Sequence, residues 1–352
     1  MSAEDDIKRI KEELAKIKHN KSTEHYIGHL KARLSKLKEK STSKKTGGGS
    51  FAVKKMGDAT AALVGFPSVG KSTLLNALTS AESRTAGYEF TTLKPIPGML
   101  EYNKTKIQLI DAPGIIEGAS EGRGGGRQIL SAVRNADLLI ILLDPRKNRL
   151  EIVRQELYDS GVRLDQSPPD VLVKKTVKGG LVVESTVKQE LSMDTIRGVL
   201  KEFGYVNAQV LLRQRLSVDE LVDALSDNRV YVPSLVVYNK VDKLSEKELK
   251  NLKKQHPKAL FISAKNESGV GELVRAVWEK LDFKRIYLKK PGRDPDYDEP
   301  LIMRGLATVQ DVIKELGKDF ESARVWGSSV KHQGITVSLK HELNDEDVVT
   351  LS

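Results

Sequence analysis

The most specific chemical signal in the sequence is the segment GFPSVGKS, residues 65–72, which has the spacing G-x-x-x-x-G-K-[ST]. It follows the apolar run ATAALV and precedes the helix-like TLLNALTS, which is the context of a phosphate-binding loop. In such a loop backbone N–H groups wrap the phosphates, while Lys71 would place its charge near the β- and γ-phosphates as a catalytic residue and Ser72 would ligate magnesium. We expect the nucleotide to be bound by Gly65, Phe66, Pro67, Ser68, Val69, Gly70, Lys71, Ser72 and Thr73.

A second segment carries groups suited to magnesium and the γ-phosphate. In IQLIDAPG, Asp111 ends an apolar strand and Gly114 completes the D-x-x-G spacing. We expect Asp111 to hold magnesium through water and the Gly114 N–H to meet the γ-phosphate, which makes Gly114 a candidate catalytic residue. Thr92, in YEFTTLKPIPG, is a candidate catalytic residue and magnesium ligand that would close only when the γ-phosphate is present. A Thr-Thr pair in a loop is also compatible with an ordinary turn.

Two further segments decide which base is bound. NKVD follows the strand-like LVVY, and SAK follows ALFI. A carboxylate at Asp242 can accept hydrogen bonds from guanine N1–H and the exocyclic amine, whereas adenine lacks those donors and would leave the carboxylate unpaired. Lys240 would cover the ring, Asn239 would brace the loop, and the Ala264 N–H would face guanine O6. The predicted base pocket consists of Asn239, Lys240, Asp242, Ser263, Ala264 and Lys265.

The position that would orient the attacking water is unusual. In Ras-like enzymes a Gln follows the D-x-x-G glycine, whereas here that residue is Ile115. We therefore expect slow intrinsic hydrolysis, which a rearranged switch region, a bound ion or a partner such as the ribosome would accelerate. The glycine-rich run 117–128 suits a nucleotide-sensitive switch, although a surface loop without function has the same composition. Arg123 and Arg127 could reach a phosphate, but exposed arginines more often face solvent or RNA, so we leave them out of the catalytic set.

Composition excludes several classes of protein. The 352 residues are 39% hydrophobic and 30% charged, as in ordinary globular chains, and the length exceeds one typical domain. No stretch provides the ~20 apolar residues that span a bilayer, and the N-terminus has no run that resembles a signal peptide, so we expect a cytoplasmic protein with no membrane partner. The absence of cysteine excludes disulfides and Cys-ligated zinc or iron–sulfur clusters.

The charge distribution favours a polyanionic partner. The formal net charge is +10, and residues 1–45 hold 13 Lys/Arg against 7 Asp/Glu, whereas residues 283–352 hold 11 against 12. RNA or a ribosome is the simplest partner of the basic N-terminal segment. A charged amphipathic helix pair is also commonly a solvated face packed on its own domain, so this interpretation of residues 1–45 stays open.

An α/β fold must position the motifs. Apolar runs alternate with helical segments, which predicts a P-loop domain of the α/β class with a mostly parallel sheet. The runs after Asp144 and before Ser234 are separated by about ninety residues, more than one crossover helix requires. We therefore predict a GTP-binding (G) domain of residues 58–165 and 229–282, interrupted by an inserted α+β subdomain of residues 166–228.

Two smaller units flank this domain. Ile7, Ile10 and Leu14 recur at helical spacing and a similar pattern follows residue 23, so we predict an N-terminal helical hairpin of residues 1–45, with the polar stretch 41–50 as a linker. The strand-like RIYLKK, a helix and a second strand-rich stretch predict a compact β-grasp domain of residues 283–352. Lys331 and His332 lack an accompanying nucleophile or metal-ligand set, so we assign them to a turn or contact surface.

The sequence resembles the Obg-like GTPases, in particular the developmentally regulated GTP-binding proteins, over nearly its whole length. The matching segments are GFPSVGKSTLLNALT, YEFTTL, DAPGIIEGASEGRGGGRQ, NKVD and VWGSSVKHQ. The resemblance implies a magnesium-dependent GTPase associated with translation, a C-terminal TGS domain, and contacts with RNA or the ribosome and with a small regulatory protein. Ser68 stands where many potassium-stimulated relatives carry Asn, which leaves open whether potassium is a second cofactor.

Two alternatives to a slow GTP-hydrolysing switch in translation are compatible with parts of the sequence. In the first, the nucleotide only stabilises a scaffold that holds RNA or a protein through the helical hairpin, and hydrolysis is secondary. In the second, the chain is a P-loop enzyme that uses another nucleotide or phosphorylates a small molecule. The NKVD segment and the lack of an obvious acceptor pocket disfavour the second alternative.

Overall fold

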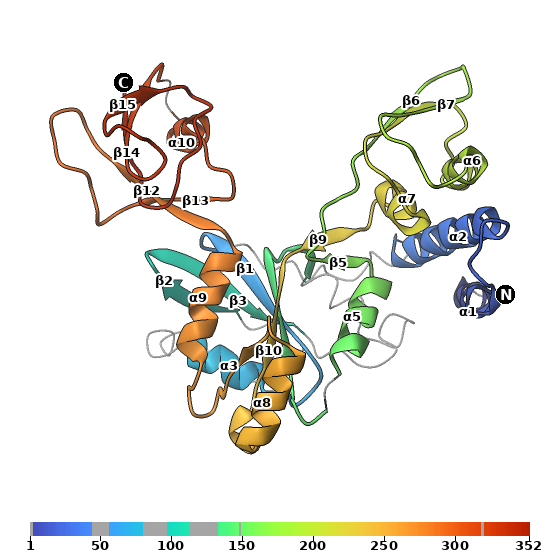
Figure 1. Ribbon diagram of the computed structural model, residues 1–352, viewed down its shortest axis with the longest axis horizontal. Helices are drawn as coiled ribbons and strands as arrows, with labels where there is room; N and C mark the ends of the chain where they lie inside the picture. The colour runs from blue at the N-terminus through green and yellow to red at the C-terminus, as the bar shows by residue number, and fades with distance from the viewer. Residues whose placement is uncertain (1–2, 44–55, 80–96, 113–132, 148, 318–319) are drawn as a thin grey trace. The chain divides into compact units, whose positions relative to one another are not determined.

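The computed structural model describes residues 3–43, 56–79, 97–112, 133–147, 149–317 and 320–352 (Figure 1). The chain divides into two compact units. The described residues of the first unit lie within 3–43 and 154–232, and those of the second lie within 56–153 and 233–352. The nucleotide-binding motifs belong to the second unit.

A six-stranded sheet forms the centre of the second unit (Figure 1). Its strand order is β11-β10-β4-β1-β3-β2, and its pairs are parallel except that of β2 with β3. Both β1 and β4 are buried at every position, as expected for parallel strands covered on both faces. The strands are β1 (Ala59–Val64), β2 (Pro97–Tyr102), β3 (Thr105–Asp111), β4 (Leu138–Leu143), β10 (Ser234–Tyr238) and β11 (Leu260–Phe261).

Helices pack on this sheet. Alternate residues of the central strands, such as Leu63 and Ile140, join Leu74 of α3 and Leu273 of α9 in one apolar cluster. This alternation follows from the two-residue period of a strand, which directs every second side chain to the same face. The helices around this sheet are α3 (Lys71–Leu78), α5 (Leu150–Asp159), which begins in this unit, α8 (Glu246–Gln255) and α9 (Val270–Lys280).

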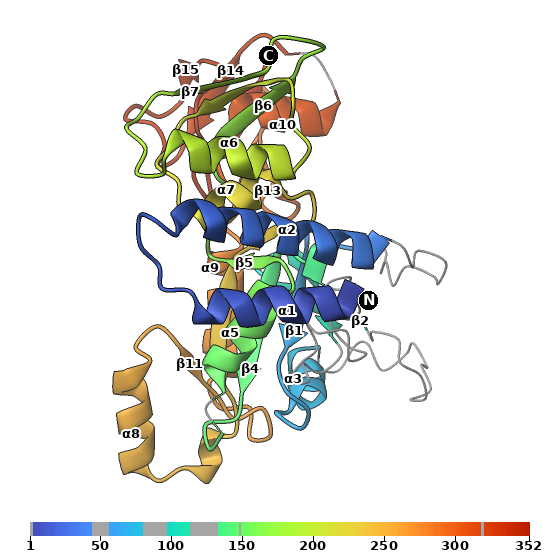
Figure 2. The same cartoon turned by 90° about the vertical axis from the view of Figure 1, so that its right-hand side faces the viewer.

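In the first unit a helical hairpin packs on an α+β subdomain. Figure 2 shows α2 side by side with α1 on one side and with α6 and α7 on the other. Ala32 of α2 is fully buried in the same core as Ile196 and Val199 of α6. Small residues permit this approach, because a Cβ at Gly28 would lie 3.2 Å from both Thr195 Cγ2 and Val199 Cγ2. The helices are α1 (Ala3–Lys16), α2 (Glu24–Ser43), α6 (Met193–Glu202) and α7 (Val218–Leu225).

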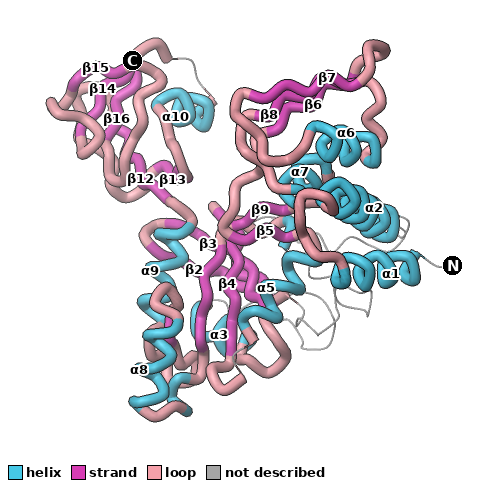
Figure 3. Tube along the Cα trace, turned by 45° about the vertical axis from the view of Figure 1, so that its right-hand side comes forward, coloured by secondary structure: helices cyan, strands magenta, loops and turns pink. Residues whose placement is uncertain are grey.

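The subdomain has a small sheet with α6 and α7 on one face (Figure 3). Its order is β6-β8-β7, and a separate parallel pair joins β5 to β9. Glu24 of α2 contributes to the start of α6, since one of its carboxylate oxygens accepts from the Ser192 N–H at 3.0 Å. The strands are β5 (Val162–Leu164), β6 (Val171–Lys175), β7 (Leu181–Ser185), β8 (Ala208–Leu212) and β9 (Val230–Val232).

The C-terminal residues of the second unit form a five-stranded sheet with one helix. The order is β13-β12-β16-β14-β15, in which β12 and β16 are parallel. The helix begins with a capping box between Thr308 and Asp311, and its apolar face packs on the sheet through Val309 and Val312. The elements are β12 (Phe283–Leu288), β13 (Leu301–Arg304), α10 (Val309–Leu316), β14 (Ala323–Trp326), β15 (Ile335–Val337) and β16 (Val348–Leu351).

The predicted fold class is confirmed: the chain has an α/β P-loop domain with a mostly parallel sheet and a C-terminal strand-rich domain. The sequence did not predict that β2 would join the sheet as an antiparallel edge. The predicted linker 41–50 is wrong at its start, because α2 continues to Ser43. No described helix combines the length and the apolar character that a membrane crossing needs.

Candidate functional site

The topology brings four motif segments to one edge of the sheet. The phosphate-binding loop follows β1, Asp111 ends β3, Asn239 follows β10, and Ser263 comes soon after β11. These strands are parallel and in register, with Leu63 opposite Asp111 and Tyr238 opposite Phe261. The carboxyl ends of neighbouring parallel strands lie at the same edge, which is where ligands bind in open α/β sheets. Segments more than 190 positions apart in the sequence therefore contribute to one site.

The phosphate-binding loop is held against the base loop by a side chain. Asn239 is buried; its Nδ2 donates to the Val69 carbonyl at 2.9 Å and its Oδ1 accepts from the Ala264 N–H at 2.9 Å. Position 70 next to Asn239 requires glycine, because the φ of Gly70 is 97° and a Cβ there would lie 2.4 Å from Asn239 Nδ2. Asn239 thus joins the three segments that were predicted to bind phosphate and guanine.

Lys71 lies at the start of α3 inside the curve of the loop. Its ammonium donates to the carbonyls of Gly65 at 3.2 Å and Phe66 at 3.3 Å. Burial lowers its pKa, while the charge of Asp111 acts in the opposite direction. The ammonium therefore lies against the backbone of the phosphate-binding loop, and the start of α3, which Lys71 opens, also favours a bound anion.

The magnesium candidates Ser72 and Asp111 lie next to each other. Ser72 Oγ donates to Asp111 Oδ2 at 3.0 Å, and Asp111 Oδ1 is buried with no hydrogen-bond partner among the described residues. Burial raises the pKa of Asp111, although Lys71 and the Ser72 hydroxyl act to lower it. A hard divalent cation prefers oxygen ligands and would compensate an unpaired carboxylate oxygen, so these two residues fit magnesium.

The base loop presents its carboxylate to solvent. Asp242 is exposed, and its Oδ1 accepts from the Ser263 hydroxyl at 2.6 Å. That hydrogen bond lowers the pKa of Asp242. Ser263 itself is buried and also accepts from the Asn266 N–H at 3.3 Å. The carboxylate that would recognise guanine is therefore oriented by the SAK segment through Ser263.

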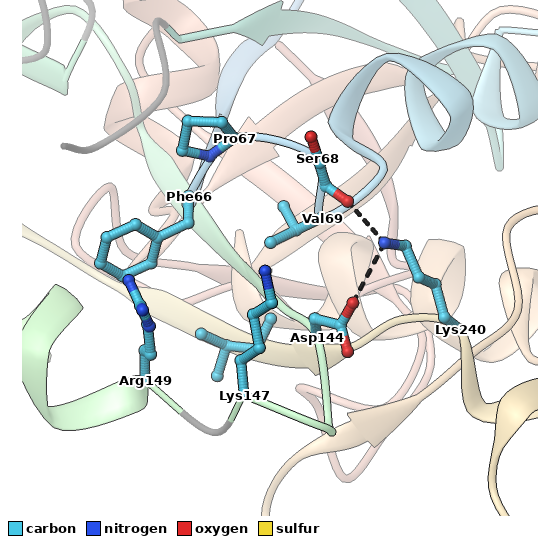
Figure 4. A pocket seen from close by; sticks show the side chains of 9 residues that line it. Phe66, Pro67, Ser68, Val69, Asp144, Lys147, Arg149 and Lys240 are labelled. Atoms are coloured by element: carbon cyan, nitrogen blue, oxygen red, sulfur yellow. Dashed lines mark hydrogen bonds and ion pairs between the residues drawn. The ribbon is translucent and has the colours of Figure 1, made fainter.

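Lys240 connects the base loop to the phosphate-binding loop. Figure 4 shows its ammonium between the backbone of Ser68 and the side chain of Asp144. Both Lys240 and Ser68 have a φ of 64°, which is uncommon for residues other than glycine. A pocket of about 350 Å³ opens here, and it is lined by Phe66, Pro67, Ser68, Val69, Leu143, Asp144, Lys147, Arg149 and Lys240.

Models of known families match the chain from residue 60 to residue 352. A model described as a 50S ribosome-binding GTPase matches residues 60–175, and one for the C-terminal region of the same domain matches residues 178–283. A TGS domain model matches residues 284–352. The matched GTPase residues include the phosphate-binding loop and Asp111, and the second match contains the base loop.

Full-length relatives decide the family. A "Developmentally-regulated GTP-binding protein 1" of Xenopus laevis is 42% identical, and the match covers 98% of this chain and 97% of the relative. The chain belongs to the developmentally regulated GTP-binding proteins. Within this family of GTPases, "Ribosome-interacting GTPase 1" of Saccharomyces cerevisiae is 43% identical over 98% of this chain and 97% of its own length. An uncharacterized GTP-binding protein of Methanocaldococcus jannaschii is 49% identical over 100% of this chain and 93% of its own length.

Several predicted residues of this GTPase lie outside the described residues. They are Thr92, Gly114, Ile115 and the glycine-rich run 117–128, which contains Arg123 and Arg127. The exposed members of the remaining predicted residues are Pro67, Ser68, Ser72, Thr73, Asp242 and Lys265. Sequence reasoning missed Asp144 and Arg146, which contact the base loop. The available signal was their position directly after β4, the strand between β1 and β10.

Replacing Asp111 by Asn should have opposite effects on the stability of the protein without nucleotide and on magnesium binding. The raised pKa means that the folded protein holds this proton more tightly than the unfolded chain, so this carboxyl stabilises the fold at acidic pH. That contribution is lost as pH rises from the ordinary value through the raised one. Asp111→Asn should therefore raise the free energy of unfolding at neutral pH by about 1 kcal/mol without nucleotide, because an ionised oxygen no longer lies unpaired.

The measurement is thermal unfolding without and with magnesium and GDP. The same variant should lose the magnesium-dependent stabilisation that GDP gives to the wild type. Asp58→Asn is the control, since Asp58 is an exposed carboxylate that accepts from the Lys106 N–H at 2.7 Å. Magnesium-dependent stabilisation of Asp111→Asn equal to that of the wild type would contradict the assignment.

Proposed function

We propose that this GTPase binds GTP with magnesium, hydrolyses it slowly to GDP and phosphate, and uses the bound nucleotide to control docking on the ribosome or its RNA. The observation that carries the proposal is the arrangement around Asn239. This one side chain joins the phosphate-binding loop, through Val69, to the two base-binding segments, through Ala264. Guanine recognition and phosphate binding are thereby combined in a single site.

The described residues divide the work of binding and hydrolysis. Lys71 places a positive charge beside the β- and γ-phosphates, where negative charge develops during transfer. Ser72 and Asp111 supply the oxygens for magnesium, with Thr92 as the proposed third contact. When bound, magnesium neutralises charge on the β- and γ-phosphate oxygens. The proposed water-orienting role has no side chain assigned to it, because Ile115 stands where Ras-like enzymes carry Gln.

Docking on the ribosome is supported by charge and by family. The yeast relative is named a ribosome-interacting GTPase, and a model described as a ribosome-binding GTPase matches this chain. The excess of positive charge in residues 1–45 suits RNA phosphates. Because α2 packs in the core of the first unit, we propose that RNA contacts use the outward surface of the hairpin and the C-terminal TGS domain. A small regulatory protein and a cytoplasmic location complete the proposal.

Single-turnover GTP cleavage tests the proposed catalysis. We expect slow cleavage by the isolated protein and faster cleavage when ribosomes are added, because Ile115 cannot orient water. Parallel reactions in sodium and potassium buffers decide whether potassium takes part beside Ser68. Lys71→Ala is the matched control and should abolish cleavage in every buffer. Rapid cleavage by the isolated wild type in sodium would contradict the proposal of a slow, partner-dependent enzyme.

Co-sedimentation with ribosomes in GDP, GTP and a non-hydrolysable analogue tests the switch. Different amounts of bound protein in the GDP and analogue reactions are expected. Equal binding in all three, combined with undetectable cleavage, would favour the scaffold alternative. Increasing salt should reduce binding steeply, since each phosphate contact releases counterions.

A further inference from the structure

The loop between β4 and α5 contacts the base loop at two places, although it carries none of the recognised GTPase motifs. Asp144 is the first residue after β4, and β4 pairs with β1 on one side and β10 on the other. The phosphate-binding loop follows β1 and the base loop follows β10. The side chain of Asp144 therefore lies at the sheet edge between the two nucleotide-binding loops.

Asp144 holds the ammonium of Lys240. Its Oδ2 accepts from Lys240 Nζ at 3.1 Å, and the same ammonium donates to the Ser68 carbonyl. Its Oδ1 accepts from the Arg146 N–H at 3.1 Å. Only 16% of the Asp144 side chain and 26% of the Lys240 side chain are exposed, so solvent screens this ion pair less than a surface pair. Burial would raise the pKa of Asp144, but these hydrogen bonds outweigh burial and lower it.

Arg146 holds the other end of the base loop. Its Nη2 donates to the Lys243 carbonyl at 2.7 Å. Lys243 ends the short 3-10 helix Val241–Lys243, which contains Asp242 and begins directly after Lys240. Asp144 and Arg146 therefore fix the residues on either side of the guanine-binding carboxylate.

The backbone of the base loop needs such support. Lys240 has a left-handed conformation with a φ of 64°, which persists in residues other than glycine only where surrounding contacts determine it. Three hydrogen bonds hold the loop here: the Lys240 ammonium donates to the Ser68 carbonyl and to Asp144, and the Lys243 carbonyl accepts from Arg146. A loop ordered in advance loses less conformational freedom when a ligand binds.

We propose that Asp144 and Arg146 are positioning residues that hold the base loop in its guanine-binding conformation and couple it to the phosphate-binding loop. This inference rests on the proposed nucleotide site and adds two residues to it. The residues act through Lys240 and Lys243, and neither touches the base. They affect nucleotide affinity and base discrimination. They affect GDP and GTP alike, because the same loop would contact the base of both.

The test measures the dissociation constants of fluorescent GDP and of a fluorescent GTP analogue. Asp144→Ala and Arg146→Ala should each weaken both nucleotides about fivefold to tenfold, the effect expected when a charge-assisted hydrogen bond is lost at a partly exposed position. KM for GTP should rise by the same factor while kcat stays unchanged, since the lost interaction serves ground state and transition state equally. Arg146→Lys should recover part of the affinity, because an ammonium can still donate to the Lys243 carbonyl.

Two further readouts distinguish positioning from a general loss of structure. IDP lacks the exocyclic amine from which Asp242 would accept a hydrogen bond, so a displaced loop should reduce the preference for GDP over IDP. In a Lys240→Ala background, Asp144→Ala should have little additional effect, because Asp144 acts through the Lys240 ammonium. Asp144→Asn keeps the volume and an acceptor, and it provides the same comparison if Asp144→Ala folds poorly.

The matched controls are Arg275→Ala and Glu279→Ala, which remove an exposed pair on α9 whose atoms are 2.8 Å apart. Both should bind GDP like the wild type. The inference is overturned if Asp144→Ala, Asp144→Asn and Arg146→Ala bind GDP and IDP like these controls. Failure of the wild type itself to bind guanine nucleotides would instead overturn the proposed function on which the inference rests.

Discussion

Replacing Asp242 by Asn should change the preference of the site from guanine to xanthine nucleotides. The carboxylate of Asp242 can accept from guanine N1–H and from the exocyclic amine. Asn offers one acceptor and one N–H donor, which match the N1–H and the C2 carbonyl of xanthine but leave the guanine amine facing a donor. Loss of two charge-assisted hydrogen bonds, at about 1.5–3 kcal/mol each, predicts at least a hundredfold weaker binding of GTP.

Competition between GTP and XTP for Asp242→Asn measures this change. The Ser263 hydroxyl, 2.6 Å from Asp242 Oδ1, can donate equally well to an amide oxygen and so should orient the new side chain. Asp242→Ala is the control and should weaken both nucleotides, since it presents neither acceptor nor donor to the base. An unchanged preference of Asp242→Asn for GTP would show that the base does not meet this residue.

Replacing Asp223 by Ala should strongly destabilise the first unit. Asp223 accepts from Arg163 Nη2 at 2.7 Å and also from the Nε atoms of Arg163 and Arg229. The exposed fractions of these three side chains are 8%, 4% and 10% for Asp223, Arg163 and Arg229. Removal of the carboxylate leaves the buried guanidinium groups of Arg163 and Arg229 without the negative charge that accepts their hydrogen bonds. The free energy of unfolding should therefore fall by about 3–5 kcal/mol.

The cluster joins β5, α7, α2 and the residue before β9, which explains why its loss should spread through the first unit. Arg163 lies on β5 and Asp223 on α7, while Arg229 precedes β9 and donates to Ser35 of α2 at 3.0 Å. Arg163 also lies over the Tyr158 ring, with its Cζ 3.7 Å from the ring centroid. The hairpin and the subdomain should therefore lose stability together.

Hydrogen exchange of the amides in α2, α6 and α7 is the measurement, supported by urea unfolding followed by far-ultraviolet circular dichroism. Tryptophan fluorescence would miss the change, because Trp278 and Trp326 both belong to the second unit. Asp219→Ala is the control on the same helix, since Asp219 is 47% exposed and pairs with Lys31 at 2.7 Å. Its expected effect is below about 1 kcal/mol. Equal protection of these amides from hydrogen exchange in Asp223→Ala and Asp219→Ala would contradict a structural role for the buried cluster.

The central sheet was predictable because its strands have a simple pattern. Runs such as LLIILL, which is β4, are apolar at every position, as parallel strands covered on both faces must be. The edge strand β2 was missed, because its sequence PGMLEY contains proline, glycine and a charge and has no continuous apolar run. Its pairing with β3 depends on a tight turn, Asn103–Lys104, where both residues have positive φ.

The candidate site was predictable to the extent that its residues belong to local motifs. The phosphate-binding loop and the base loop each follow a strand directly, so topology alone places them at one edge. Asp144 and Arg146 were missed because their importance comes from partners about one hundred positions away, Lys240 and Lys243. No spacing in the sequence records such a pair.

The sequence by itself determined the nucleotide chemistry, because phosphate and guanine recognition depend on residue types at short, fixed spacings within single loops. The tertiary structure alone decided how those loops are held. Asn239 bridges Val69 and Ala264, and Asp144 shares the Lys240 ammonium with Ser68. It also decided where the N-terminal helices pack, since Ser35 meets Ser226 at 2.8 Å across 191 positions of chain. Periodicity shows that a helix has an apolar face, whereas only the folded chain shows which core that face completes.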